Sequence, residues 1–191
     1  MRYSELERLD IRRITAPEEE RFCVIDFETN GMVGAGCEVI EFAAVKVEHM
    51  ELTYQVSEFC SASAPLSPFI KRLTGIKDGM ILGKPKFETF VPLLIDFARD
   101  CVLVAHNAPF DVGILLGYCD RLGIEFMPRV ICTLTSSRRL FPDFPSHRLE
   151  VLSELFAIKS GRSHRALDDT LATARLLILM FEYLKEKGRY G

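Results

Sequence analysis

Residues 22–28 have the sequence Phe22-Cys23-Val24-Ile25-Asp26-Phe27-Glu28, an apolar run interrupted by two carboxylates. The run is rich in β-branched and aromatic residues and is followed by the turn-forming pair Asn30-Gly31, which predicts a β-strand over 21–29. Side chains two residues apart in a strand share one face, so Asp26 and Glu28 lie side by side. Adjacent carboxylates repel unless a cation lies between them, and such oxygen ligands suit Mg²⁺ or Mn²⁺. An exposed strand end, where water solvates both groups, would explain the same pattern.

The bulk composition predicts one globular domain. The 191-residue chain is 48% hydrophobic and 27% charged, and it has no low-complexity tract. The longest aliphatic stretch, 176–181, is too short to span a bilayer, and the N-terminus carries no apolar signal core. Six dispersed cysteines without zinc-site spacing fit reduced thiols. We therefore expect a cytoplasmic protein with no membrane attachment.

The net charge of −3 argues against a strongly basic nucleic-acid-binding surface. If four acidic residues are set aside as metal ligands, 24 basic residues against 23 acidic ones leave a charge of +1. A weakly charged protein of this kind can still hold a nucleic-acid end through bound metal and a few local contacts. The charge alone therefore neither requires nor forbids that partner.

The order of the predicted elements indicates an α/β domain with a mixed sheet. Strands are predicted over 21–29, 38–48, 52–60 and 101–105, and helices over 69–73, 87–99, 110–123, 151–156 and about 165–187. Residues 1–20 are dense in charge and contain Pro17, so we expect an arm or short helix outside the core. The domain itself is placed at 21–187, followed by a short tail at 188–191.

A second polar cluster, His106-Asn107-Ala108-Pro109-Phe110-Asp111, directly follows the apolar strand at 101–105. Pro109 fits the first turn of a helix, where a missing N–H costs nothing, and Asn107 or its neighbour could cap that helix. Asp111 falls in the first turn, where the helix dipole favours a negative charge. Since an ordinary acid at a helix start has the same signature, this cluster alone does not establish a metal ligand.

The third cluster, His164-Arg165-Ala166-Leu167-Asp168-Asp169, begins the last helix. At 100° per residue, Asp168 falls on the solvent face, whereas Asp169 lines up with an inward stripe (Ala172, Leu176, Met180 and Tyr183). Asp169 is therefore the ligand candidate, and Asp168 is expected to be solvated. A neutral imidazole can take a proton from a metal-bound water near pH 7, which makes His164 the candidate general base. An incidental histidine before a helix is the alternative.

Together, the segments Asp26-x-Glu28, His106-Asn107-x-x-Phe110-Asp111 and His164-x-x-x-x-Asp169 resemble the three motifs of the DEDDh 3′–5′ exonucleases. The resemblance runs in register from Phe22 to about Leu179 and is strongest to the proofreading (epsilon) branch of bacterial DNA polymerase III. Residues 26–31, 73–76, 137–142 and 147–149 support it. It implies the ribonuclease-H-like fold, with a five-stranded mixed sheet flanked by helices.

The resemblance also implies a site for two Mg²⁺ or Mn²⁺ ions held by Asp26, Glu28, Asp111 and Asp169. Asp26 would bridge the ions, Glu28 and Asp169 would complete the water-activating site, and Asp111 would hold the second ion. His164 would deprotonate the water. Thr29 matches a position that contacts the terminal 3′-OH, and Met32 matches an apolar wedge beneath the last base. Asn107 and Phe110 match positions near the terminal nucleotide, although Met32 or Phe110 could instead belong to the core.

The function implied is a metal-dependent 3′–5′ exonuclease that releases nucleoside 5′-monophosphates from single-stranded or frayed DNA ends, in proofreading or repair. One alternative is an exoribonuclease acting on RNA or oligoribonucleotides. Another is a non-catalytic module that binds a polymerase or nucleic acid, although degenerate modules should lose some of the five polar positions present here. The expected partners are a single-stranded DNA 3′ end and a DNA polymerase subunit. With no long tail after the last helix, the protein is expected to act alone or to dock through its surface or its N-terminal arm.

Overall fold

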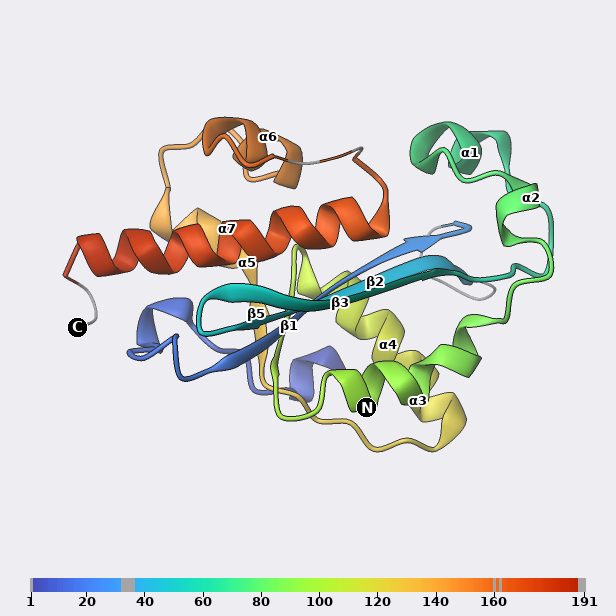
Figure 1. The fold of residues 1–191 in the computed structure, drawn as a ribbon, viewed down its shortest axis with the longest axis horizontal. Coiled ribbons are helices and arrows are strands. Elements are labelled where there is room, and N and C mark those ends of the chain that lie inside the picture. The colour runs from blue at the N-terminus through green and yellow to red at the C-terminus, as the bar shows by residue number, and fades with distance from the viewer. Residues whose placement is uncertain (1, 32–36, 160, 162, 189–191) are drawn as a thin grey trace.

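A five-stranded mixed sheet forms the centre of the molecule in the computed structural model, which describes residues 2–31, 37–159, 161 and 163–188 (Figure 1). The strands are β1 (Arg21–Thr29), β2 (Val39–Glu48), β3 (Glu51–Phe59), β4 (Val102–Ala105) and β5 (Val130–Cys132), in the spatial order β3-β2-β1-β4-β5. β2 is antiparallel to β1 and β3, whereas β4 is parallel to β1 and β5. The predicted α/β class and five-stranded mixed sheet are confirmed.

Seven α-helices and two short 3₁₀ turns accompany the sheet within the described residues. The helices are α1 (Pro68–Thr74), α2 (Asp78–Ile81), α3 (Phe87–Phe97), α4 (Ala108–Leu122), α5 (Thr133–Leu140), α6 (Leu149–Leu155) and α7 (Ala166–Glu186), and the turns are η1 (Tyr3–Glu5) and η2 (Ile11–Arg13). The elements predicted from periodicity agree with these bounds to within two residues at each end. α2, β5 and α5 were not predicted, because short elements carry too few residues to show a period.

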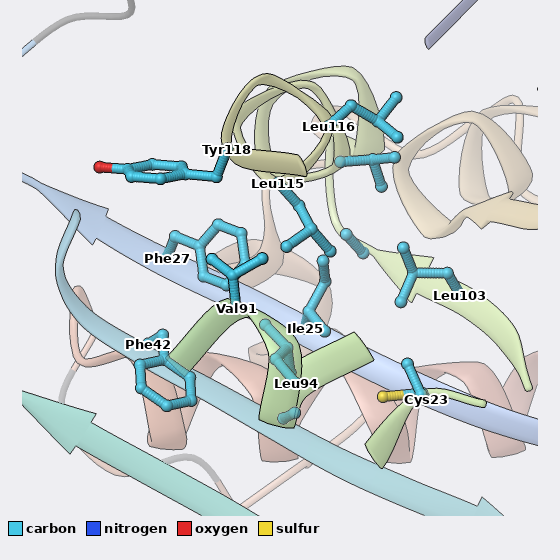
Figure 2. Packing of buried hydrophobic residues seen from close by; sticks show 14 of the residues in the cluster. Cys23, Ile25, Phe27, Phe42, Val91, Leu94, Leu103, Leu115, Leu116 and Tyr118 are labelled. Atoms are coloured by element: carbon cyan, nitrogen blue, oxygen red, sulfur yellow. The ribbon is translucent and has the colours of Figure 1, made fainter. Parts of the chain in front are cut away.

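The two faces of β1 are covered by different helices. Ile25 and Phe27 pack into a cluster with α3 and α4, where Val91, Leu94 and Leu115 interdigitate with them (Figure 2). Phe22 and Val24 point to the opposite face and pack against α7, with the Phe22 and Phe181 rings 5.5 Å apart. Because side chains alternate along a strand, Asp26 and Glu28 continue the row that faces α7.

The N-terminal segment is not an arm outside the core, so that expectation is wrong. Leu6, Ile11 and Ile14 are buried, and Ile11 is fully enclosed. The backbone N–H of Leu9 donates to the carbonyl of Val130, and the N–H of Val130 donates to the carbonyl of Glu7. The N-terminal segment therefore covers the open edge of β5. The prediction failed because the charges belong to exposed side chains, while a few apolar residues between them enter the core.

Two further expectations concern the cysteines and the membrane. All six cysteines are unpaired thiols, of which Cys23, Cys60, Cys101 and Cys119 are buried. Within the part of the chain that the structure describes, no helix has both the length and the apolar character needed to cross a membrane.

Candidate active site

Three separate segments bring the predicted acids to one edge of the sheet. Asp26 and Glu28 lie near the carboxyl end of β1, and Asp111 lies in the first turn of α4, directly after β4. Because β1 and β4 are parallel, their carboxyl ends meet at the same edge. Asp169 reaches this edge from the first turn of α7, which packs on the β1 face that carries Asp26 and Glu28. Glu28 and Asp111 are only 8% and 3% exposed, and Asp26 and Asp169 are partly buried.

Main-chain donors hold two of these carboxylates in place. The N–H of Phe27 donates to Asp111 Oδ1 at 3.1 Å, which joins α4 to β1 between the two acids of that strand. The N–H of His164 donates to Asp169 Oδ2 at 2.8 Å. One carboxylate oxygen each of Glu28 and Asp169 and one ring nitrogen of His164 lie within 4.8 Å of one another. These three groups can therefore share one small ligand.

Burial, and to a lesser extent the neighbouring carboxylates, disfavours ionisation of the four acids. Burial, followed by the charges of Asp111, Glu28 and Asp169, raises the pKa of Asp26 well above its usual value. Burial is also the main cause of a pKa of about 8 for both Glu28 and Asp111, and of about 6 for Asp169. Without a cation, this cluster must therefore hold protons near neutral pH.

The donor set fits divalent metal ions. All four acids offer hard oxygen ligands, which suit Mg²⁺ and Mn²⁺, and their mutual repulsion would be relieved by cations among them. Burial is the main reason that the pKa values of Glu28 and Asp111 are raised, and a bound cation would favour their ionised forms. The alternative interpretation of Asp26 and Glu28, a solvated pair at an exposed strand end, is excluded because Glu28 is buried.

His164 lies in the loop before α7 with a left-handed backbone, at φ 60°. Few residues other than glycine adopt this conformation, and where they do the strain is often found at functional sites. Its side chain is 43% exposed, and its Nε2 lies 3.6 Å from Glu150 Oε1, which is too long for a hydrogen bond. The ring therefore stands between the acids and solvent, next to one further carboxylate.

A cleft of about 920 Å³ opens above the acids. One wall is apolar and comes from α1 (Phe69, Ile70 and Leu73), and the opposite wall comes from α5, α6 and the segment between them (Arg138, Pro145, His147, Arg148 and Glu150). Thr29, Asn107 and Phe110 also line the cleft, so the structure brings these three predicted substrate contacts to the acids. Phe110 is half-buried and is not a core residue. Met32 lies outside the described residues.

Asn107 precedes α4 with a left-handed backbone, at φ 74° and ψ 49°. Pro109 occupies the first turn of the helix as expected, but the Asn107 side chain makes no capping hydrogen bond, so the expected cap is absent. Asparagine tolerates this conformation better than most residues. The Asn107 side chain is exposed and lines the cleft, and it does not cap the helix.

Asp168 and Asp169 point to different surroundings, as their helical phases predict, but Asp168 is less exposed than expected. Asp169, not Asp168, lies beside Glu28 and His164. Asp168 is half-buried, however, and its carboxylate lies so close to Gly161 that a Cβ at that position would overlap it. Asp168 therefore packs against the loop before α7 and is not simply solvated.

Sequence reasoning missed Glu41 and Glu150. Glu41 interrupts the apolar run 39–45 of β2 in the way that Asp26 and Glu28 interrupt theirs, and it is 2% exposed. The same argument about buried carboxylates would have found it. Glu150 carries no comparable signal, because an acid in the first turn of a helix is common.

Comparisons with known proteins place this chain in a family. The model of the RNase T exonuclease family matches residues 23–177. The PolC-type DNA polymerase III of Bacillus subtilis is 40% identical over 173 residues, which cover 90% of this chain and 12% of that polymerase. The chain thus spans about an eighth of the length of that relative.

Two solved structures share the fold. Exonuclease X in complex with 5′ overhanging duplex DNA superposes with a TM-score of 0.67 at 28% identity, covering 87% of this chain and 93% of that one. The nuclease domain of 3′hExo, a DEDDh family member bound to rAMP, superposes with a TM-score of 0.72 at 22% identity, covering 89% and 94%. The expected ribonuclease-H-like fold is confirmed, and a family match over most of its length shows that the chain belongs to the DEDDh 3′–5′ exonucleases, hydrolases of phosphodiester bonds.

Proposed function

We propose that this exonuclease releases nucleoside 5′-monophosphates from single-stranded or frayed DNA 3′ ends, in proofreading or repair. The observation that carries the proposal is the meeting of Glu28, Asp169 and His164 within 4.8 Å at the base of an open cleft. An exonuclease needs a site that admits a chain end, and a cleft with one apolar wall can receive unpaired bases.

Asp26, Glu28, Asp111 and Asp169 are the proposed metal ligands. Two divalent cations bound there would activate the attacking water and stabilise the charge that develops on the phosphate. Asp26 belongs among these ligands because it is buried beside Asp111, Glu28 and Asp169, and a cation bound there would offset the repulsion among their charges. The main-chain donors to Asp111 and Asp169 fix these two carboxylates before any ligand binds, which lowers the cost of assembling the site.

His164 is the proposed general base, which takes a proton from the attacking water. Its half-exposed position allows the imidazole to pass that proton to solvent after each turnover. The Glu150 carboxylate lies 3.6 Å from His164 Nε2, at the outer side of the site. Asp169 also accepts the His164 N–H, so the base and a metal ligand are held by one contact.

The terminal nucleotide is proposed to contact Thr29, Asn107 and Phe110. The Thr29 hydroxyl donates to the carbonyl of Gly31 at 2.7 Å, so its oxygen remains able to accept a hydrogen bond from a 3′-OH. Phe110 offers a ring on which a base can stack, a contact worth about 1–3 kcal/mol. Met32, as a wedge beneath the last base, remains a prediction.

Two of the reported relatives support DNA as the substrate class, although the 3′hExo domain, at 22% identity, is bound to rAMP. The Bacillus subtilis relative is a DNA polymerase, and exonuclease X is solved with duplex DNA. A DNA polymerase subunit is the proposed protein partner, because that relative carries the matching segment within a polymerase chain.

The test uses 5′-labelled single-stranded DNA and a matched RNA, each with Mg²⁺ or Mn²⁺. We expect stepwise shortening of the DNA from its 3′ end, lost with EDTA or Asp26→Ala. His164→Ala should lower the rate at least about 100-fold with unchanged circular dichroism. Glu154→Gln, on the exposed face of α6, is the matched control. Faster shortening of RNA would make the protein an exoribonuclease, and intact substrates under both metals would make it a binding module.

A further inference from the structure

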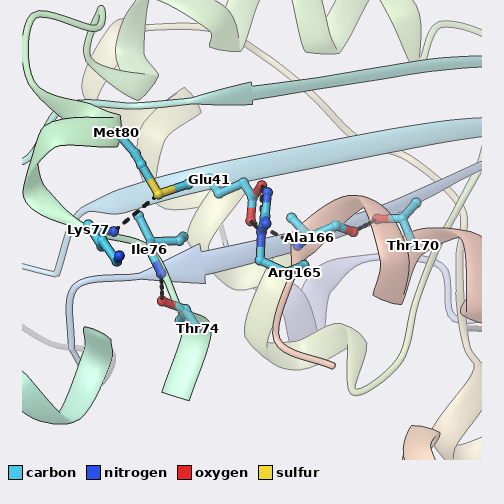
Figure 3. A network of polar contacts seen from close by, with 8 residues as sticks. All are labelled: Glu41, Thr74, Ile76, Lys77, Met80, Arg165, Ala166 and Thr170. Atoms are coloured by element: carbon cyan, nitrogen blue, oxygen red, sulfur yellow. Dashed lines mark hydrogen bonds and ion pairs between the residues drawn. The ribbon is translucent and has the colours of Figure 1, made fainter. Parts of the chain in front are cut away.

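A fifth carboxylate lies beside the four proposed metal ligands and is neutralised by the protein itself. Glu41 on β2 is 2% exposed and stands directly opposite Glu28 in the β1–β2 register. The Arg165 guanidinium donates to both of its oxygens, through Nη2 at 2.9 Å to Oε1 and through Nε at 3.1 and 3.2 Å (Figure 3). Glu41 is therefore a buried acid with its own cation, unlike Glu28.

Glu41 also holds the main chain at the start of α7. The N–H of Ala166 donates to Glu41 Oε2 at 3.1 Å, so one carboxylate binds the side chain of one residue and the backbone of the next (Figure 3). The guanidinium of Arg165 lies over the Phe59 ring of β3 at 5.3 Å. Strand β2 thus anchors both residues that immediately follow His164, and the edge strand β3 adds a contact to the first of them.

Asp169 links this anchor to His164 through two hydrogen bonds. The Asp169 N–H donates to the carbonyl of Arg165, and the Asp169 carboxylate accepts the N–H of His164. His164 itself has the left-handed backbone at φ 60°, a conformation that persists only when its surroundings hold it. The Glu41 contacts supply such a restraint on the C-terminal side of His164.

We propose that Glu41, through its pairing with Arg165 and the Ala166 N–H, is a positioning residue that holds the His164 imidazole toward Glu28 and Asp169. This inference rests on the proposed role of His164 as the base. A planar guanidinium that donates to both carboxylate oxygens restrains rotation as well as distance, which a lysine ammonium does not. The pairing has a second consequence, because it occupies the Glu41 oxygens and keeps this acid from competing for metal.

The test is a double-mutant cycle on single-turnover rates with DNA and Mn²⁺. Glu41→Gln retains the side-chain shape and an oxygen for the Ala166 N–H but lacks the charge that pairs with Arg165. We expect the rate constant to fall about 10- to 100-fold, as when a catalytic group is misplaced by about 1 Å. KM and the Mn²⁺ half-saturation should stay within about twofold of wild type. In the His164→Ala background the same substitution should cause no further loss, because its effect passes through the imidazole.

Arg165→Lys provides a second variant should Glu41→Gln fail to fold, since it preserves the charge that neutralises Glu41. We expect it to reproduce the loss of rate in the wild-type background and to have no effect with His164→Ala. A loss of equal size in both backgrounds, or an unchanged rate for these variants while His164→Ala is impaired, would overturn the positioning role and leave the proposed function standing. Full activity of His164→Ala would overturn both the positioning role and the role of His164 as the base, while the exonuclease activity itself would stand.

Discussion

Removal of one acid from the cluster should stabilise the metal-free protein even as it abolishes activity. Burial, with the charges of Asp169 and Glu41, raises the pKa of Glu28 from 4.5 to about 8. A raised carboxyl pKa means that the folded protein binds this proton more tightly than the unfolded chain does. The stabilisation is therefore fully present below pH 4.5 and is lost as the pH rises through 8. Glu28→Gln cannot ionise, so it should escape this loss.

The size of the effect follows from the shift. About 3.5 pKa units at about 1.36 kcal/mol each give about 5 kcal/mol well above pH 8, and about 4 kcal/mol at pH 7.5. Because neighbouring acids share the repulsion and the site relaxes, we expect the free energy of unfolding of Glu28→Gln to exceed that of wild type by about 2 kcal/mol at pH 7.5. For a domain of this size, that gain corresponds to a Tm rise of about 4–8 °C.

The assay is thermal and urea denaturation in EDTA from pH 4 to pH 8.5, repeated with Mn²⁺. The gain should vanish near pH 4, and Mn²⁺ should reverse the order, because only the wild type retains the full ligand set. Glu154→Gln, an exposed acid on α6, should change nothing. A Glu28→Gln protein less stable than wild type in EDTA at pH 7.5, or a gain that persists at pH 4, would refute the reasoning.

Three further predictions concern the same edge of the sheet. Asp169→Asn should lower turnover at least about 100-fold, whereas Asp168→Asn should retain most of it; equal losses would contradict the assigned helix phase. Binding of Mn²⁺ should release at least one proton at pH 7 and a smaller number at pH 9, because the carboxyl groups are already less protonated there. Calorimetry in buffers of different ionisation enthalpy measures this number, and proton uptake would contradict the raised carboxyl pKa values. Asn107→Gly should leave the Tm nearly unchanged, because glycine adopts a φ of 74° freely, yet raise the KM for single-stranded DNA. An unchanged KM would remove the proposed contact.

The sequence was enough to predict an element and its inward face wherever a local pattern of apolar residues specifies them. The alternation of β1 predicted both its bounds and the face shared by Asp26 and Glu28. The 100° phase of the last helix separated Asp169 from Asp168, because the inward stripe repeats through Ala172, Leu176 and Met180, all of which are buried. In both cases the element is long enough for its period to be visible.

It failed where an element exists only through distant partners. β5 has three residues and is stable because Val130 pairs with Leu103 of β4 and exchanges backbone hydrogen bonds with Glu7 and Leu9. The N-terminal segment looks like a charged arm until this edge of the sheet is present to receive it. Neither feature has a period or a composition of its own that marks it as structured.

The sequence alone determined which residues can carry the chemistry, since the residue types and spacings of the three motifs are written along the chain. Only the tertiary structure decided which buried acids the protein neutralises. Glu28 and Glu41 are neighbours across β1 and β2, yet Arg165, 124 residues away from Glu41 in sequence, pairs with one and leaves the other among carboxylates. Strand register and the position at which α7 begins set that choice, and both depend on contacts that no local pattern records.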